Sequence, residues 1–402
     1  LFQGRSRATA FACITAGTGA AALTPVPYGI VLDMAGFRVA FLISASFFAL
    51  LLVLSRTIPD VKGVETLRFD TIGFLLSSGG LFFVLMGVAL IPTHGLLLAS
   101  RTASLSFWGI SPCAPLLSIG SGMLFAFIHH EKMREAQGAP ALMPSVFFSS
   151  AAARHALVAV AFPFFLSGSM NIAVIPFMQM VANATAIESG LLLACAGMPM
   201  IALAVGIPRF APKAPAKAVI RIGYVTGAAG MAVIAWAMAR PDPLMLTCIG
   251  MLVAGAGMGT VNSQANNAMA TAVGEKNAPQ SGGIQGTARD IAHSLSTALV
   301  GAMLSFFLAH SFGIAIQPAI AIDSTSRLDI SSEELTLMDD ESFLGMLDTI
   351  ELDGEAERTV LKAYQDARTH ASQLVLMALS AGTICLILFT SGLPSAPLKL
   401  PR

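Results

Sequence analysis

Charged residues are scarce in this chain. Asp, Glu, Lys and Arg together make up 11% of its 402 residues, whereas a soluble domain carries about 25%. Hydrophobic residues reach 55%, the mean hydropathy is +0.74 and the formal net charge is zero. This composition argues against a water-soluble fold, and the balanced charge gives no indication of nucleic acid as a partner.

The familiar signatures of catalysis and metal binding are also missing. The five cysteines are scattered without a CxxC spacing, so neither a disulfide framework nor a zinc site is predicted. No glycine-rich phosphate loop, GxSxG or HExxH motif occurs. We therefore expect no cofactor, no metal and no catalytic residues. A membrane-embedded enzyme stays as a minor alternative, for which the sequence offers no convincing nucleophile.

Long apolar runs dominate the chain instead. A helix needs about 20 apolar residues to cross the hydrocarbon core, and the runs are too long for barrel strands and lack period-two alternation. The sequence predicts an all-α polytopic membrane protein with about ten transmembrane helices. The expected spans are 8–32, 37–55, 71–91, 104–128, 152–181, 187–207, 219–239, 244–272, 284–312 and 371–392.

The distribution of Lys and Arg predicts the orientation. With the N-terminus of this sequence in the cytoplasm, the cytoplasmic loops collect fifteen Lys and Arg residues and the opposite short loops three, in accord with the positive-inside rule. A multi-pass protein of the cell membrane is therefore expected, with the lipid bilayer as its surroundings.

Segment 313–370 differs from the other loops, because it carries thirteen acidic and four basic residues and faces outside in this topology. Ser331 and Glu334 have the spacing of a capping box, so we expect one or two short surface helices. The segment is either a solvated loop or a vestibule that attracts cations.

Full charges occur near the middle of only one apolar run, 284–312. Arg289 and Asp290 each cost about 2.5–3.5 kcal/mol at the centre of a membrane helix, and such residues are retained mainly for transport or proton relay. We expect Asp290 to take up and release protons, with Arg289 and His293 tuning its pKa. An interfacial cluster with a purely structural role is the alternative.

Several amide side chains lie within the apolar runs. An unpaired amide is expensive in hydrocarbon, so each should face another helix or a water-filled path. Substrate contact and interhelical hydrogen bonding both stay open as explanations. The candidates for the substrate path are Asn262, Gln264, Asn266, Asn267, Asn171 and Gln179.

Small residues recur every fourth position in the first run, at Gly17, Ala21, Pro25 and Gly29. They stack on one helix face and allow close helix approach, while Pro25 removes a backbone donor and favours a bend. The pattern indicates either tight packing or a hinge.

The segment 129–131 (His-His-Glu) lies at a cytoplasmic helix end, where we expect contacts with lipid headgroups and no metal.

The first two runs resemble the antiporter motif of drug:proton antiporters in the major facilitator superfamily. Pro25, Gly29, Gly36 and Arg38 have the family spacing, although Thr24 replaces a glycine. Further likenesses occur in chain order in four segments: 69–73 (Phe-Asp-Thr-Ile-Gly), 140–147 (Pro-Ala-Leu-Met-Pro-Ser-Val-Phe), 255–259 (Gly-Ala-Gly-Met-Gly) and 286–289 (Gly-Thr-Ala-Arg).

The resemblance implies the fourteen-helix branch of that superfamily, without its first four helices. Residues 1–55 would be the remainder of the N-terminal bundle, 56–150 two extra central helices and a linker, and 151–402 a six-helix C-terminal bundle. The second-half loop signature is incomplete, since 208–213 (Pro-Arg-Phe-Ala-Pro-Lys) lacks the Asp-Arg pair. The resemblance implies export of small amphipathic or cationic compounds in exchange for protons, with an uncoupled facilitator or importer as the alternative.

Overall fold

The structure is a computed structural model of the chain, and it describes residues 24–57, 70–97, 109–139, 141–211, 213–274, 278–316, 338, 340–347 and 354–393. Within these residues the regular structure is helical, as the sequence predicts. The helices are α2 (Pro25–Ser55), α3 (Thr71–Ala89), α4 (Ile91–His94), α5 (Cys113–Ala136), α6 (Val146–Ser149), α7 (Ala151–Ala173), α8 (Ile175–Met180), α9 (Ala186–Phe210), α10 (Ala216–Ala237), α11 (Leu244–Val273), α12 (Ala278–Ile316), α14 (Asp340–Leu347), α15 (Gly354–Cys385) and the short 3-10 helix η4 (Leu386–Thr390).

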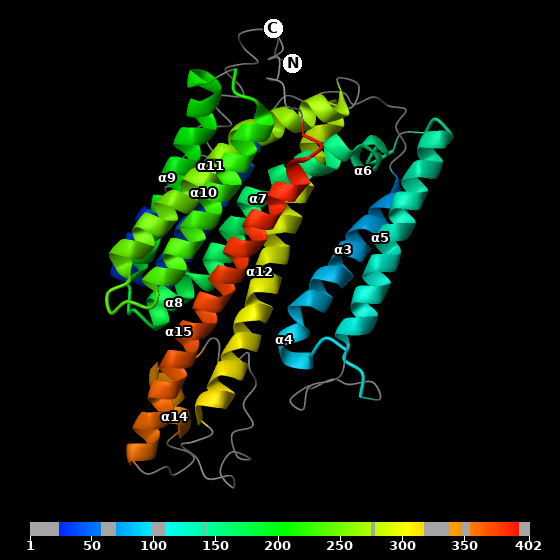
Figure 1. Ribbon diagram of the computed structural model, residues 1–402. Helices are drawn as coiled ribbons and strands as arrows, with labels where there is room; N and C mark the ends of the chain where they lie inside the picture. The colour runs from blue at the N-terminus through cyan, green and yellow to red at the C-terminus, as the bar shows by residue number, and fades with distance from the viewer. Residues whose placement is uncertain are drawn as a thin grey trace.

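Nine stretches of helix in the described part of the chain are long and apolar enough to cross a membrane. Helices α7 to α12 and α15 gather into one bundle, and α3 and α5 form a pair beside it (Figure 1). The α3–α5 pair touches the bundle through α12, and α2 packs against α9 on another side. The main apolar core lies inside the bundle, between α7, α9, α10, α11, α12 and α15.

Helix α2 covers the second expected span and the end of the first. Its backbone is helical from Pro25 to Ser55 except at Gly36, whose φ of 76° and ψ of 172° divide the helix into two parts. A positive φ favours glycine, so the break falls where the sequence places the turn between the two runs. The rest of the first span, with Gly17 and Ala21, lies outside the described residues.

The last helix corrects the expected start of the tenth span. Helix α15 begins at Gly354, well before residue 371, and its first turns are amphipathic. They pack their apolar face on α12 and on α14, where Phe343 and Tyr364 stack with ring centroids 4.0 Å apart. A polar sequence can therefore continue a spanning helix when one face is covered. The proposed capping box at Ser331 and Glu334 falls outside the described residues.

Helix α5 also differs from the fourth expected span. It runs from Cys113 to Ala136, whereas the hydropathy placed this span at 104–128. The start is set by Pro112 and by the Ser111 hydroxyl, which accepts a hydrogen bond from the Cys113 amide at 3.2 Å. The helix continues to Ala136, and Glu131 in its last turns is buried within the protein.

Glycines allow α11 to approach two neighbours closely. A Cβ on Gly257 would lie 2.6 Å from the Cα of Gly227 and 2.7 Å from the carbonyl oxygen of Gly223, both on α10. A Cβ on Gly259 would lie 2.7 Å from the Cα of Met200 on α9. Membrane helices associate through such small-residue contacts, since lipid provides no hydrophobic drive between them. The glycines of 255–259 therefore place α11 at the centre of the bundle.

This packing gives a test in which helix propensity and sterics oppose each other. Alanine is a better helix former than glycine by about 1 kcal/mol, yet Gly257→Ala would push α10 away, and overpacking of this kind costs about 1–3 kcal/mol. We expect Gly257→Ala to lower the thermal unfolding temperature in detergent. The control Gly122→Ala, whose Cβ would meet nothing within 4 Å, should leave it unchanged or raise it; equal behaviour of the two variants contradicts the packing described here.

Candidate functional site

An open cavity of about 620 Å³ lies within the bundle between α7, α9, α11 and α12. Its apolar wall includes Phe164, Met200 and Met258, and Pro25 of α2 borders it. Its polar lining consists of Ser167, Asn171, Asn262, Ser263, Asn266, Asn267 and Arg289. Apolar walls with a few placed polar groups are the usual form of a small-molecule site.

Arg289 is the one charged side chain among the described residues that line this cavity. Its Nη2 donates a hydrogen bond to Oδ1 of Asn266 at 2.8 Å, which links α12 to α11. Its guanidinium carbon lies 5.2 Å from the ring centroid of Phe164, a cation–π distance. Its Nε is buried and has no hydrogen-bond partner among the described residues. The Arg289 side chain on α12 thus contacts α11 and α7, while its Nε–H remains available as a donor.

Asn262 supplies the complementary group, since its Oδ1 is buried and finds no partner among the residues that the structure describes. It lies one helical turn before Asn266 on α11, so both amides share a face of that helix. A buried polar atom without a partner costs about 1–3 kcal/mol. An unpaired acceptor and an unpaired donor in one cavity are therefore groups that a ligand or water can satisfy.

The six amides predicted for the substrate path divide into two groups. Asn171, Asn262, Asn266 and Asn267 line the cavity. Gln264 is only 5% exposed and lies on another face of α11. Gln179 donates to the Ser189 hydroxyl at 3.0 Å, which ties α8 to α9. Residue type alone marked all six, and the helical phase of each residue decides which of them reach the cavity.

The charged group on α12 is also divided. Arg289 points into the cavity, whereas Asp290 is exposed and does not line it. The carbonyl of His293 accepts hydrogen bonds from the hydroxyls of Ser296 and Thr297 at 2.8 and 2.7 Å, and its backbone lies against Gly168 of α7. Asp290 and Arg289 still interact electrostatically as sequence neighbours.

Pro25 and Gly29 of the predicted hinge motif lie where α2 meets α9. A Cβ on Gly29 would lie 2.6 Å from the carbonyl oxygen of Ala186, and a Cβ on Gly190 would lie 2.6 Å from that of Pro25. Asp33, also on α2, accepts a hydrogen bond from the Ile187 amide at 3.1 Å. Small residues on both helices thus bring two backbones together beside the cavity.

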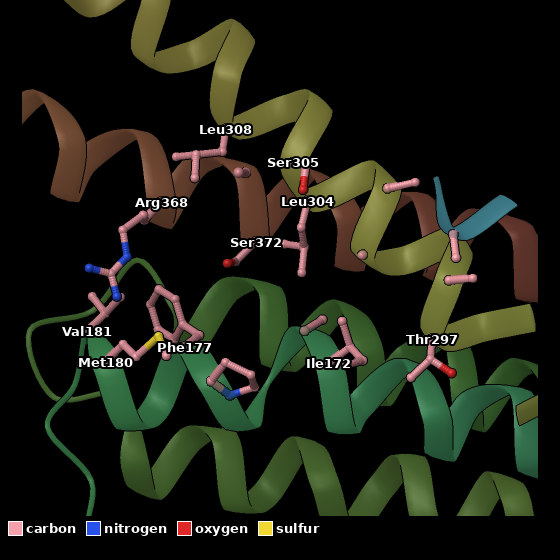
Figure 2. Close-up of a pocket in the computed structure, with 17 residues that line it drawn as sticks. Ile172, Phe177, Met180, Val181, Thr297, Leu304, Ser305, Leu308, Arg368 and Ser372 are labelled. Carbon is pink, nitrogen blue, oxygen red and sulfur yellow. The ribbon is translucent and has the colours of Figure 1, made fainter. Parts of the chain in front are cut away.

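A second cavity of about 270 Å³ lies between α7, α8, α12 and α15 (Figure 2). Ile172, Phe177 and Leu304 make its lining mainly apolar, and Arg368 stands at one end. Arg368 is bound to Asp340 of α14 at 2.8 Å and lies over the Tyr364 ring. Because its charged group already has these partners, we consider the larger cavity, with its two unpaired atoms, the better candidate for a functional site.

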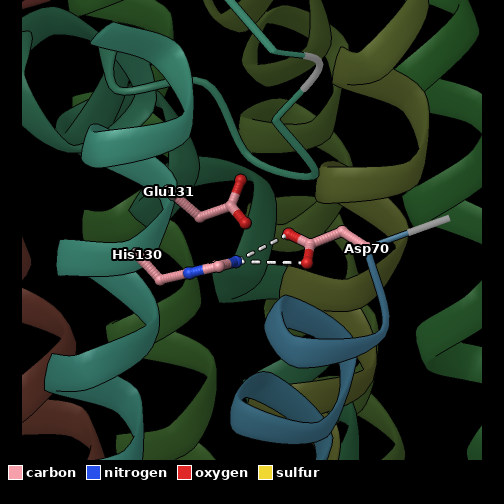
Figure 3. A group of neighbouring side chains, drawn as sticks. All are labelled: Asp70, His130 and Glu131. Atoms are coloured by element: carbon pink, nitrogen blue, oxygen red, sulfur yellow. Dashed lines mark hydrogen bonds and ion pairs between the residues drawn. The ribbon is translucent and has the colours of Figure 1, made fainter. Parts of the chain in front are cut away.

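A polar cluster outside both cavities corrects the expectation for 129–131. Nε2 of His130 lies 3.1 and 3.2 Å from the two carboxylate oxygens of Asp70 (Figure 3). Nε of Arg134 lies 3.4 Å from one of these oxygens. Glu131 is 1% exposed. His130 and Glu131 therefore face the start of α3 and not lipid headgroups. Asp70 and His130 are 60 residues apart in the sequence, and only the antiparallel pairing of α3 with α5 brings them together.

Comparison with known proteins identifies the family. The Major Facilitator Superfamily profile matches residues 1–297 of this chain. The chain belongs to this superfamily. Its fold class agrees with the prediction from sequence, an all-α polytopic membrane protein with a major-facilitator-like bundle. The family and the apolar helices together make this chain part of a multi-pass membrane protein.

Two curated relatives carry the same description, Multidrug resistance protein B homolog, in two strains of Mycobacterium tuberculosis. The H37Rv protein is 25% identical over 306 residues and the CDC 1551 protein 24% identical, in each case over 75% of this chain. The aligned region spans 54% of each relative, so this chain matches about half of their length. A crystal structure of a bacterial homologue of the human lysosomal transporter Spinster, inward-facing and unoccupied, matches at 14% identity and a TM-score of 0.44, over 80% of this chain and 66% of that one.

The unpaired oxygen of Asn262 leads to a prediction about the stability of the folded protein. Asn262→Leu removes a buried acceptor that has no partner and keeps a similar volume, a change that is neutral or stabilising. We expect an unchanged or higher thermal unfolding temperature, measured in detergent. Ser263→Ala is the control, since it removes a hydroxyl that donates to the Thr260 carbonyl at 2.6 Å. A marked destabilisation by Asn262→Leu alone would show that the oxygen has a structural partner.

Proposed function

We propose that this protein is a secondary active transporter that exports small amphipathic compounds in exchange for protons. The observation that carries the proposal is the open cavity among the spanning helices, in which scarce polar side chains and an arginine face apolar walls. The relatives described as multidrug resistance proteins support export of small molecules. The path would be formed by Asn171, Asn262, Asn266 and Asn267.

The described part of the cavity bears on the substrate class. The sequence led us to expect amphipathic or cationic compounds. Arg289 places a positive charge at the wall, and no described lining residue offers a negative one. A like charge within a low-dielectric site is repelled, so of the two classes we propose amphipathic compounds without a permanent positive charge.

Coupling to protons would rest on α12. Asp290 is one residue from Arg289, so a change of its charge alters the field at the guanidinium that lines the cavity. In this proposal Asp290 takes up a proton from one side and releases it on the other, with Arg289 and His293 setting its affinity. Arg289 also binds Asn266 on α11, so protonation of Asp290 would bias the contact between two helices that line the path.

Alternating access needs two bodies that rock about the site. We propose that residues 151–402 form one of them and residues 1–55 part of the other, with 56–150 supplying the extra helix pair and a linker. The contact of α2 with α9, through Gly29, Gly190 and Pro25, would then be the close-packed hinge. Gly17 and Ala21 would extend the same face.

An uncoupled facilitator or importer on the same fold is the second candidate. It is favoured by the exposure of Asp290 outside the cavity, since a proton carrier usually faces the path. Vesicles that contain the protein and an environment-sensitive amphipathic dye separate the two functions. Export that stops when a protonophore collapses the gradient supports exchange, and transport that continues down the dye gradient supports facilitation.

The role of Asp290 is tested by Asp290→Asn in the full-length protein. The amide cannot release a proton, so we expect gradient-driven export to fall at least tenfold while dye exchange at zero gradient persists. Asp242→Asn in the loop between α10 and α11 is the matched control and should transport as the unmodified protein does. Unchanged coupling in Asp290→Asn removes this residue from the mechanism.

A further inference from the structure

The Asp70–Glu131 cluster holds two carboxylates in a confined space at one end of the α3–α5 pair. Asp70 caps α3 by accepting a hydrogen bond from the Gly73 amide at 3.0 Å. A Cβ on Gly73 would lie 2.5 Å from Oδ2 of Asp70 and 2.8 Å from Oε1 of Glu131. Both oxygens therefore occupy the space that this glycine leaves open. Figure 3 shows the Glu131 carboxylate turned toward that of Asp70.

The two oxygens of Glu131 have different surroundings. Oε2 accepts a hydrogen bond from the Met143 amide at 2.9 Å. Oε1 is buried and has no hydrogen-bond partner among the described residues. A bare carboxylate oxygen in that position, beside a second carboxylate and away from water, is strongly disfavoured, because like charges in one buried site cannot both ionise.

The charges of the cluster do not balance without a further proton. His130 donates from Nε2 to Asp70, since a carboxylate only accepts. Two carboxylates face the guanidinium of Arg134 and the imidazole of His130, so they share one permanent cation between them. Among the elements packed here, α12 carries Arg289, Asp290, His293 and His310, and neither carboxylate of the cluster bonds any of them.

We propose that Glu131 and Asp70 share one proton at neutral pH, which makes this cluster a proton-binding site separate from the cavity. The proton resides on Oε1 of Glu131 and is donated to Oδ2 of Asp70. Asp70 is the acceptor because, although burial opposes its ionisation, the Gly73 amide, His130 and Arg134 together hold its pKa below the usual range. The site stands whether or not Asp290 couples transport to protons.

The competing ligand for these residue types is a divalent cation. Asp70, His130 and Glu131 each offer one ligand atom, and these atoms lie within 4.8 Å of one another. The donation from Nε2 of His130 to Asp70 and the guanidinium of Arg134 at 3.4 Å both oppose an added positive ion. A proton satisfies the unpaired oxygen without displacing either group.

Occupancy of the site has a structural consequence. Glu131 bonds the Met143 amide in the segment that joins α5 to α6 and then to α7, and α7 lines the cavity through Phe164, Ser167 and Asn171. Loss of the shared proton places two negative charges side by side and separates the start of α3 from this segment. The folded state then holds a proton that the unfolded chain releases at neutral pH, so the contribution of this proton to stability is lost as pH rises. Asp70, whose pKa is lowered, contributes stability that is lost only in more acidic solution.

Glu131→Gln tests the site with little disturbance of the fold. The amide can donate to Oδ2 of Asp70 and accept from Met143, as the protonated acid does. Glu135→Gln is the matched control, because Glu135 lies one turn further along α5 and accepts from the Ser145 amide at 2.9 Å. The readouts are the infrared carbonyl band of a protonated carboxylic acid and the thermal unfolding temperature across pH, both on the purified full chain.

We expect the unmodified protein and Glu135→Gln to show a carboxylic acid band that disappears as pH rises, together with a fall of several degrees in the unfolding temperature. Glu131→Gln should lack this band and this part of the pH dependence. The proposal is overturned if Glu131→Gln keeps both. It is also overturned if Mn²⁺ at constant pH binds the unmodified protein stoichiometrically and abolishes the band, while Glu131→Gln binds none, since the cluster would then be a cation site.

Discussion

Lipid offers no hydrogen bonds, so each polar atom on a spanning helix needs a partner inside the protein or an open cavity to face. Hydroxyls meet this requirement locally: Thr226 and Thr383 donate to carbonyls one turn earlier, at 2.9 and 2.8 Å. Gln179, Asn266 and Arg289 instead bond across helices, Gln179 to Ser189 and Arg289 to Asn266. The collection of Asn266 and Arg289 around one cavity follows from this constraint, and glycine contacts bring the helices close enough to enclose it.

The sequence predicted the helical class, the family and most span positions, because hydropathy over twenty residues responds directly to the bilayer. It also singled out Arg289, Asn262 and Asn266, because polar residues are conspicuous in apolar runs; the structure places all three at the cavity, and their functional role stays a prediction. It misjudged the start of α15, since a helix with one covered face can be polar on the other. It included Gln264 and Gln179, because residue type does not show which way a helix face points.

The cluster at Asp70 shows a different limit of prediction from sequence. His130 and Glu131 looked like groups at a helix end in contact with headgroups, and Asp70 looked like the first residue of another helix. Tertiary pairing of α3 with α5 buries Glu131 to 1% exposure and places it beside Asp70. The same segment then leads through Met143 toward α7 and the cavity. The two proposed proton sites, one on α12 and one on the α3–α5 pair, thus adjoin helices that line the cavity.

The central claim is that lipid surrounds the helices while water reaches the polar cavity. It is tested most directly by labelling three positions of α11 with a membrane-impermeant maleimide, in vesicles and with the five native cysteines replaced by serine. Asn267→Cys should react because it lines the cavity, Gln264→Cys should not because it is buried, and Leu252→Cys should resist although 39% of Leu252 is exposed. Equal labelling of Leu252→Cys and Asn267→Cys would contradict the account.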